Sequence, residues 1–159
     1  MRIFLISDTH FDHDNIVKYE NRPENFNEII IENWNKLINK DDLIMHLGDF
    51  CLSGTNRWEY YIKNLNGRKI LIRGNHDSKS FLRLLGLGFD FVCDGFIWGI
   101  YGKIILFTHE PVLELPSWID LNIHGHQHSK GEYIDDKHKL FAIENTNYCP
   151  ILLSKFIEK

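Results

Sequence analysis

The chain has 159 residues, 43% of them hydrophobic and 25% charged, which fits one globular domain over residues 1–159. Its net charge of −4 argues against a broad basic surface for extended nucleic acid. No apolar run reaches the roughly 20 residues of a membrane span, and the apolar start ends at Ser7. We therefore expect a cytoplasmic protein without a membrane partner. The three cysteines form no CxxC pair, so we expect reduced, buried thiols.

The first half of the chain alternates apolar runs with amphipathic segments. Three runs predict buried strands: residues 2–7, 43–47 and 69–73. Apolar residues at helical spacing predict two helices, over residues 26–38 and 58–65. Asn25 is the expected N-cap of the first helix, and Gly67 is the expected stop of the second. Ser78 is expected to cap a short helix that runs through Leu85.

The second half is mostly strand in pattern. Four short runs predict strands: residues 89–92, 96–100, 104–108 and 121–124. Residues 133–134 and 140–143 suggest a hairpin around Asp135 and Asp136. The tail from Pro150 to Lys159 fits either a strand or a short helix. The order predicts an α/β (α+β) fold, in which a two-sheet β-sandwich is flanked by helices.

Polar clusters follow the predicted strands at five places: Asp8-Thr9-His10, Gly48-Asp49, Gly74-Asn75-His76-Asp77, Thr108-His109-Glu110-Pro111 and Gly125-His126-Gln127-His128. Strand ends gather along one edge of a sheet with parallel neighbours, so these loops should converge on one pocket. Carboxylate, amide and imidazole groups without thiolate suit Mn²⁺, Fe²⁺, Zn²⁺ or Ni²⁺ better than Ca²⁺ or a structural zinc. A carboxylate among them can bridge two cations about 3.5–4 Å apart, the separation used for phosphoryl displacement.

The order DxH, GD, GNHD, H and GHxH resembles that of the calcineurin-like metallophosphoesterases. All five blocks are present in order, between Asp8 and His128. More locally, SDTHFDHDNI at residues 7–16, the stretch from Asn21 and HLGDF at residues 46–50 resemble a subgroup of small bacterial and phage members.

The resemblance implies a metallophosphoesterase-like sandwich that holds two divalent metal ions, with Mn²⁺ the first choice and Fe, Zn or Ni as alternatives. It implies these ligands: Asp8, His10 and His128 for the first metal, Asn75, His109 and His126 for the second, and Asp49 bridging both. It also implies that His76 stabilises or protonates the leaving group and that Asp77 orients it. A metal-bridging hydroxide would then attack phosphorus.

The expected function is therefore that of a metal-dependent phosphoric ester hydrolase. The absence of a basic face favours a small phosphate-ester or nucleotide-like substrate, and we favour a diester over a monoester. The alternative is a catalytically silent scaffold of the same fold, although the intact ligand set argues against it. Nothing in the sequence requires a redox or nuclease-accessory role. Open edge strands could support a homodimer.

Four further histidines have plainer interpretations. His46 lies in an apolar strand and is expected to be a satisfied core residue. His124 is expected to face away from the metals. His13 is interpreted as part of a solvated loop rather than a substrate contact, and His138 as a surface residue.

For three charged residues the sequence leaves two alternative interpretations each. Arg22 and Arg73 are candidate phosphate contacts, although an arginine more often pairs with an acid while its stem covers apolar surface. Asp77 could cap the following helix instead of orienting His76.

Overall fold

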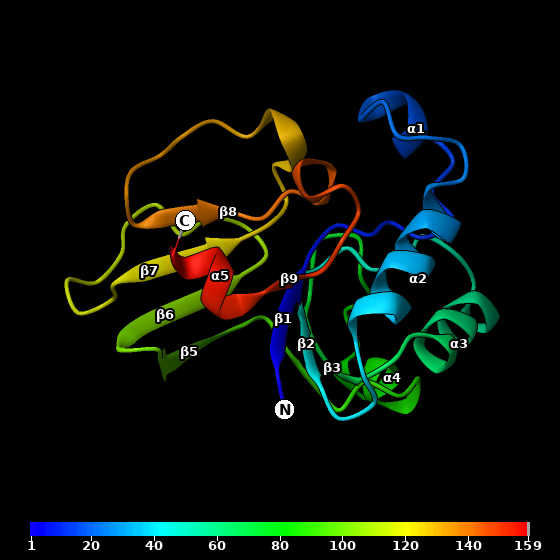
Figure 1. Ribbon diagram of the computed structural model, residues 1–159, viewed down its shortest axis with the longest axis horizontal. Helices are drawn as coiled ribbons and strands as arrows, with labels where there is room; N and C mark the ends of the chain where they lie inside the picture. The colour runs from blue at the N-terminus through cyan, green and yellow to red at the C-terminus, as the bar shows by residue number, and fades with distance from the viewer. Residues whose placement is uncertain (159) are drawn as a thin grey trace.

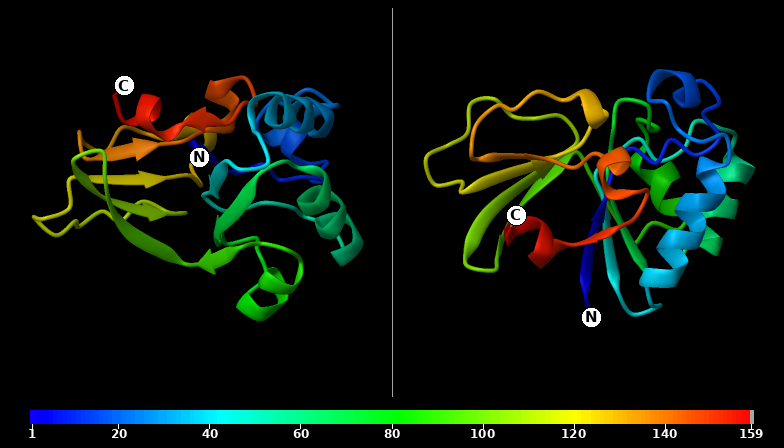
Figure 2. Two further views of the ribbon diagram at one scale, coloured as in Figure 1. Left: turned by 60° about the horizontal axis from the view of Figure 1, so that its bottom comes forward. Right: turned by 45° about the horizontal axis from the view of Figure 1, so that its top comes forward.

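The computed structural model describes residues 1–158, which form two β-sheets flanked by helices (Figures 1 and 2). The first sheet has the order β4–β3–β2–β1–β9. Its strands are β1 (Ile3–Ile6), β2 (Leu43–His46), β3 (Arg68–Ile72), β4 (Phe91–Cys93) and β9 (Ile151–Leu152). β1 to β4 pair in parallel, and β9 adds an antiparallel edge beside β1. This confirms the predicted mixed α/β sandwich.

The second sheet has the order β5–β6–β7–β8. Its strands are β5 (Gly95–Ile100), β6 (Lys103–Thr108), β7 (Leu121–His124) and β8 (His138–Leu140). β6, β7 and β8 run parallel, while β5 pairs antiparallel with β6. In Figure 1 this sheet lies to the left of the first one, on the side away from α2 and α3.

The helices are α1 (Ile16–Tyr19), α2 (Phe26–Leu37), α3 (Thr55–Asn64), α4 (Phe81–Gly86) and α5 (Leu153–Glu158), with 3₁₀ turns η1 (His128–Lys130) and η2 (Ile143–Thr146). Trp34 of α2 and Tyr61 of α3 are almost fully buried, which confirms that their apolar faces pack into the core. Every residue of β1 and β2 is buried, as expected for parallel strands covered on both faces. No helix within residues 1–158 combines the length and apolar character needed to cross a membrane.

Some local predictions are wrong. Asn25 precedes α2 without a side-chain cap, and Ser80 rather than Ser78 caps α4 by accepting a hydrogen bond from the backbone N–H of Arg83. The predicted hairpin does not form, because β8 pairs in parallel with β7 and the Asp135 carboxylate instead accepts hydrogen bonds from the backbone of a turn. The tail forms both β9 and α5. Of the three free thiols, Cys51 is buried and the other two are half-buried.

Candidate metal centre

The first sheet brings its polar strand ends to one edge. Asp8 follows β1, Asp49 lies just beyond β2, and Asn75 lies just beyond β3. The backbone N–H of Asp8 donates to the carbonyl of Gly48, and that of His10 donates to the carbonyl of Asp49, each at 2.9 Å. Because the strands are parallel, their carboxyl ends meet, and the loops that follow are bonded side by side.

The second sheet supplies three imidazoles to the same place. His109 follows β6, while His126 and His128 follow β7. The backbone N–H of Gly125 donates to the carbonyl of His109 at 2.9 Å. The backbone N–H of His126 donates to Oδ2 of Asp8 at 3.0 Å, which joins the two sheets at the site.

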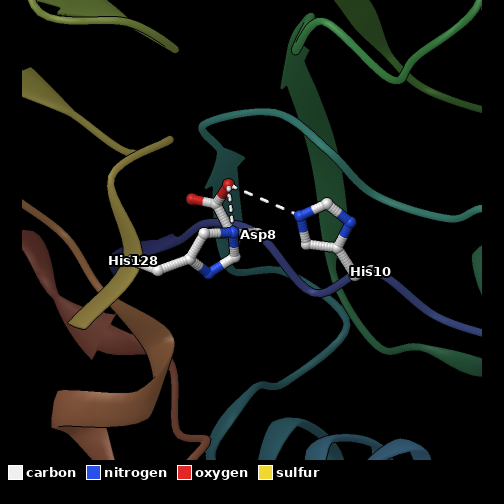
Figure 3. Close-up of side chains that lie close together, drawn as sticks. All are labelled: Asp8, His10 and His128. Atoms are coloured by element: carbon white, nitrogen blue, oxygen red, sulfur yellow. Dashed lines mark ion pairs between the residues drawn. The ribbon is translucent and has the colours of Figure 1, made fainter. Parts of the chain in front are cut away.

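Asp8, His10 and His128 form what we call the first cluster (Figure 3). Nε2 of His10 lies 3.8 Å from Oδ1 of Asp8, and Nε2 of His128 lies 3.9 Å from the same oxygen. The two imidazole rings are stacked, with centroids 5.1 Å apart. One ion between these three atoms would be within reach of all of them.

Asn75, His109 and His126 form the second cluster. Nε2 of His109 lies 3.0 Å from Oδ1 of Asn75 and 3.2 Å from Nδ1 of His126. Asp49 lies between the clusters, because its Oδ2 is 3.5 Å from Nε2 of His10 and 3.5 Å from Nε2 of His109. The structure thus brings together all seven side chains that the sequence motifs selected.

The donor atoms fit divalent cations. Oδ1 of Asp8 and both ring nitrogens of His10 are buried without a hydrogen-bond partner. Buried polar atoms normally have partners, so unpaired ones that converge need an ion or another polar group to satisfy them. Carboxylate, amide and imidazole donors at this spacing suit transition-metal divalent ions.

The backbone at the site is strained. Five of the seven side chains belong to non-glycine residues with positive φ: Asp8 at 54°, His10 at 47°, Asp49 at 56°, His126 at 68° and His128 at 50°. Such conformations cost of the order of 1–3 kcal/mol each and persist only where the surroundings impose them. Within residues 1–158 five further non-glycine residues have positive φ, but five of seven is a high share for one site, which indicates that the fold imposes the positions of these side chains.

Two glycines allow the loops to approach this closely. A Cβ at Gly74 would lie 2.0 Å from Oδ1 of Asp49, and a Cβ at Gly125 would lie 2.0 Å from Oγ of Ser7 and 2.5 Å from Oδ2 of Asp8. Any side chain at either position would therefore displace a carboxylate of the site. This is the physical reason for glycine in the GNHD and GHxH motifs.

The pKa values of the titratable groups in the site are shifted in different directions. Burial lowers the pKa of His10 to about 2 and raises the pKa of Asp8. Burial also opposes the charged form of His109, but the hydrogen bond and charge of Asp49 outweigh it and raise the pKa of His109 to about 9. Burial likewise opposes ionisation of Asp49, but His109 overcomes it and holds that pKa at about 2.

Hydrogen-bond acceptors fix the orientation of the His109 and His128 imidazole rings. Nδ1 of His109 donates to the carbonyl of Leu47 at 2.7 Å, and Nδ1 of His128 donates to Oε1 of Glu144 at 3.1 Å. In each ring the other nitrogen, Nε2, is left for the site. Such partners set the tautomer of metal-binding histidines and increase their basicity.

Glu144 and Arg22 form a buried network that sequence reasoning missed. The Arg22 guanidinium, whose side chain is fully buried, donates to Glu144 at 2.6 Å, to the carbonyl of Asp8 at 2.7 Å and to that of Thr9 at 2.9 Å. Arg22 is therefore held inside the protein rather than presented to a substrate phosphate. Glu144 belongs to no motif, so no local signal could have revealed it.

The structure also corrects the prediction for Asp77. Its Oδ2 accepts hydrogen bonds from the backbone N–H groups of Asp49 and Gly74, and its Oδ1 accepts one from Phe50. Within residues 1–158 no hydrogen bond joins Asp77 to the His76 ring, and the carboxylate does not cap α4. Asp77 instead binds the GNHD loop to the Asp49 loop.

His76 and His13 lie at the cleft above the centre. The His76 ring centroid is 5.5 Å from that of His10, and the His13 ring centroid is 5.4 Å from it. Both line a cavity of about 370 Å³ with Asp49, His126 and His128. His13 is a partly exposed loop residue, and its place in this cleft leaves a substrate contact open.

The remaining histidines are structural. His46 is buried, and its ring nitrogens bond to Oγ1 of Thr9 and the backbone N–H of Gly48, as predicted for a satisfied core residue. His124 is also buried and bonds to the Gly125 carbonyl. The His138 ring is only 2% exposed, because it bonds to Asp135 and to the Val112 carbonyl, so the surface prediction is wrong.

Comparisons with known proteins agree with this geometry. A family model described as calcineurin-like phosphoesterase matches residues 1–148. The uncharacterized protein MJ1445 of Methanocaldococcus jannaschii is 36% identical over 179 aligned positions, which cover 99% of this chain and 92% of that protein.

Solved structures show the same fold. The protein of unknown function AQ665 from Aquifex aeolicus superposes with a TM-score of 0.81 at 31% identity, over 99% of this chain and 98% of that one. Nuclease MPE of Pseudomonas putida superposes with a TM-score of 0.57 at 22% identity, over 89% and 74% of the two chains, which is a likeness of fold.

Proposed function

This chain belongs to the calcineurin-like phosphoesterase family, and we propose that it hydrolyses phosphodiesters with two divalent cations held by the two clusters. The observation that carries the proposal is the position of Asp49. One of its oxygens lies 3.5 Å from a histidine nitrogen of each cluster, where a single carboxylate oxygen can contact two ions. We propose Mn²⁺ as the working metal, because the mixed oxygen and imidazole donors suit it.

The residues have separate roles in this proposal. Asp8, His10 and His128 would hold one cation, Asn75, His109 and His126 the other, and Asp49 would bridge them. Bound cations in such sites lower the pKa of water and neutralise charge on the phosphate oxygens. Glu144 and the Leu47 carbonyl keep the Nε2 atoms of His128 and His109 aimed at the centre.

In the hydrolysis, the oxygen of water forms a bond to phosphorus, and the bond from phosphorus to the leaving oxygen breaks. The leaving oxygen keeps the electron pair and takes a proton from protonated His76, while the attacking water releases a proton to solvent, from which His76 is later reprotonated. Two observations support this role for His76: it lines the cleft, and its backbone N–H donates to Oδ1 of Asp49 at 2.9 Å. A positioned acid of this kind contributes roughly 10²–10⁴-fold to rate.

The charge of the cleft favours a diester over a monoester. Within residues 1–158, the residues that line the 370 Å³ cavity include Glu20 and Asp49 but no arginine or lysine. A phosphomonoester dianion carries a second charge that is usually matched by such a cation, whereas a diester carries only one.

The test compares chromogenic phosphodiester and phosphomonoester hydrolysis by metal-stripped protein before and after addition of Mn²⁺. We expect metal-dependent turnover with the diester preferred. Asp49→Asn should remove it almost completely, and His76→Ala should lower it by roughly 10²–10⁴-fold. Metal binding without turnover of either ester would favour the scaffold alternative, and no metal binding would refute the assignment of the centre.

A further inference from the structure

A second cavity, of about 360 Å³, adjoins the cleft at His76. Apolar and polar side chains both line it: the apolar ones include Trp58, Leu84 and Leu87, and the polar ones include Ser53, Ser78 and Arg83. Ligand pockets typically measure roughly 300–1,000 Å³, so this one has room for a single compact group.

His76 lines both this cavity and the metal cleft. The group that protonates a leaving oxygen must lie within hydrogen-bond reach of it in the reacting complex. A substituent on that oxygen therefore extends past His76. The cavity on that side is the space available to it.

The cation that lines this cavity is Arg83. Its guanidinium donates to Oγ1 of Thr55 at 2.8 Å and forms no ion pair within residues 1–158. Asp77 also lines the cavity, but its buried carboxylate binds three backbone N–H groups and forms no ion pair with Arg83 within residues 1–158. Arg83 is thus a cation that is free to bind an anion.

A third cavity, of about 330 Å³, also contains an arginine, but the surroundings of that arginine differ from those of Arg83. This cavity adjoins the centre at Asn75 and His109, and its arginine is Arg73. Arg73 donates to Asp94 at 2.7 Å, and Glu110 lines the same space. The positive charge there is already matched by acids, so an anionic group is favoured beside Arg83 and disfavoured beside Arg73.

We propose that the cavity between His76 and Arg83 binds the leaving group of the phosphate ester, and that Arg83 selects leaving groups that carry a carboxylate or phosphate. This inference rests on the proposed phosphoesterase function and specifies its substrate class. The preferred substrate is a phosphodiester whose leaving alcohol is compact and anionic.

The test uses two methyl aryl phosphates that differ only in the leaving phenol, one with a meta-carboxylate and one with the neutral carboxamide. Each is hydrolysed by Mn²⁺-loaded wild type, by Arg83→Gln and by Arg68→Gln. Arg68 is the matched control, because it is exposed and pairs with Asp90 outside the cavity. Differences in intrinsic reactivity cancel when the ratio of the two esters is compared between proteins.

We expect Arg83→Gln to lower kcat/KM for the carboxylate ester about fivefold, the upper range for an exposed ion pair, and to leave the carboxamide ester unchanged. Arg68→Gln should change neither ester, and added salt should reduce the wild-type preference. A meta-phosphonate ester shows whether phosphate is preferred over carboxylate. A ratio that Arg83→Gln does not change overturns the inference while leaving the phosphoesterase function intact. Failure of wild type to hydrolyse any of these esters overturns both.

Discussion

The two clusters of the centre are held in different ways. In the first cluster, the orientation of His128 depends on the side chain of Glu144, which is itself held by the buried Arg22. In the second cluster, the orientation of His109 depends on the main-chain carbonyl of Leu47. The first cluster therefore depends on a charged network that substitution can remove, whereas the second depends on the backbone of the fold.

The two clusters also differ in solvent exposure, and the first is the more buried of the two. In the first cluster Asp8 and His10 are almost fully buried and His128 is half-buried. In the second, His109 is buried, His126 is half-buried and Asn75 is exposed. Buried charges need partners, and within the first cluster the Arg22 network supplies one to His128, through Glu144. The clusters should therefore respond unequally to substitution and to pH.

The largest expected effect comes from Arg22→Met. It leaves the Glu144 carboxylate buried without its cation and removes the donors to the Asp8 and Thr9 carbonyls. Breaking a buried pair by removing one partner costs about 3–5 kcal/mol of unfolding free energy, which urea titration of metal-stripped protein measures.

Arg68→Met is the control for that measurement. Its ion pair with Asp90 is exposed, so the loss should not exceed about 1 kcal/mol. The double variant Arg22→Met with Glu144→Leu should recover part of the stability, because no unpaired charge stays buried. Equal losses for Arg22→Met and Arg68→Met would show that the buried network does not support the first cluster.

The next effect distinguishes the two metals. Glu144→Gln removes the charged partner of His128 and leaves the bond from His109 to Leu47 in place. Calorimetric titration should resolve two Mn²⁺ affinities. We expect the affinity of the first cluster to fall by roughly 10–100-fold and that of the second cluster to stay unchanged.

His126→Ala is the complementary variant, because it removes a side chain of the second cluster only. The site that it weakens should be the one that Glu144→Gln spares. If both affinities fall together in Glu144→Gln, the two clusters do not bind independently.

The sequence predicted the parts of the fold and the centre that are encoded locally. Apolar runs followed by polar residues located the strands, and the polar loops contained the seven side chains that the structure brings together. Their role as metal ligands stays a prediction. Parallel pairing explains the success, because strand ends that are far apart in sequence meet at one edge.

The parts that were missed depend on contacts between distant residues. Arg22 and Glu144 are 122 positions apart, and no pattern along the chain links them. Asp77 was assigned to its neighbour His76, but its partners include Asp49 and Phe50, which lie in another loop. The hairpin prediction failed because the pairing of β8 with β7 is decided by the sheet and not by the turn residues.

The smallest expected effect is on the pH dependence of the unfolding free energy, to which His10 and His109 contribute differently. The pKa of His109 is raised to about 9 in the folded protein, so its stabilisation is complete below about pH 6.5 and is lost as the pH rises through 9. The pKa of His10 is lowered to about 2, so folded His10 is neutral over that range, while its partial protonation in the unfolded chain near pH 6.5 gives a small slope of the opposite sign.

The raised pKa of His109 should therefore cost metal-stripped protein about 1 kcal/mol of unfolding free energy between pH 7 and 8, and the lowered pKa values of His10, His46 and His124 should offset part of that loss. Urea titrations at the two pH values measure this loss. His109→Gln should reduce the slope without abolishing it, because Glu144 also raises the pKa of His128 against the effect of burial. Saturating Mn²⁺ should change the slope, since metal binding displaces these protons. A metal-stripped protein equally stable at both pH values would show that Asp49 does not hold a proton on His109, and the proposed contrast between the two clusters would then rest on the Arg22 network alone.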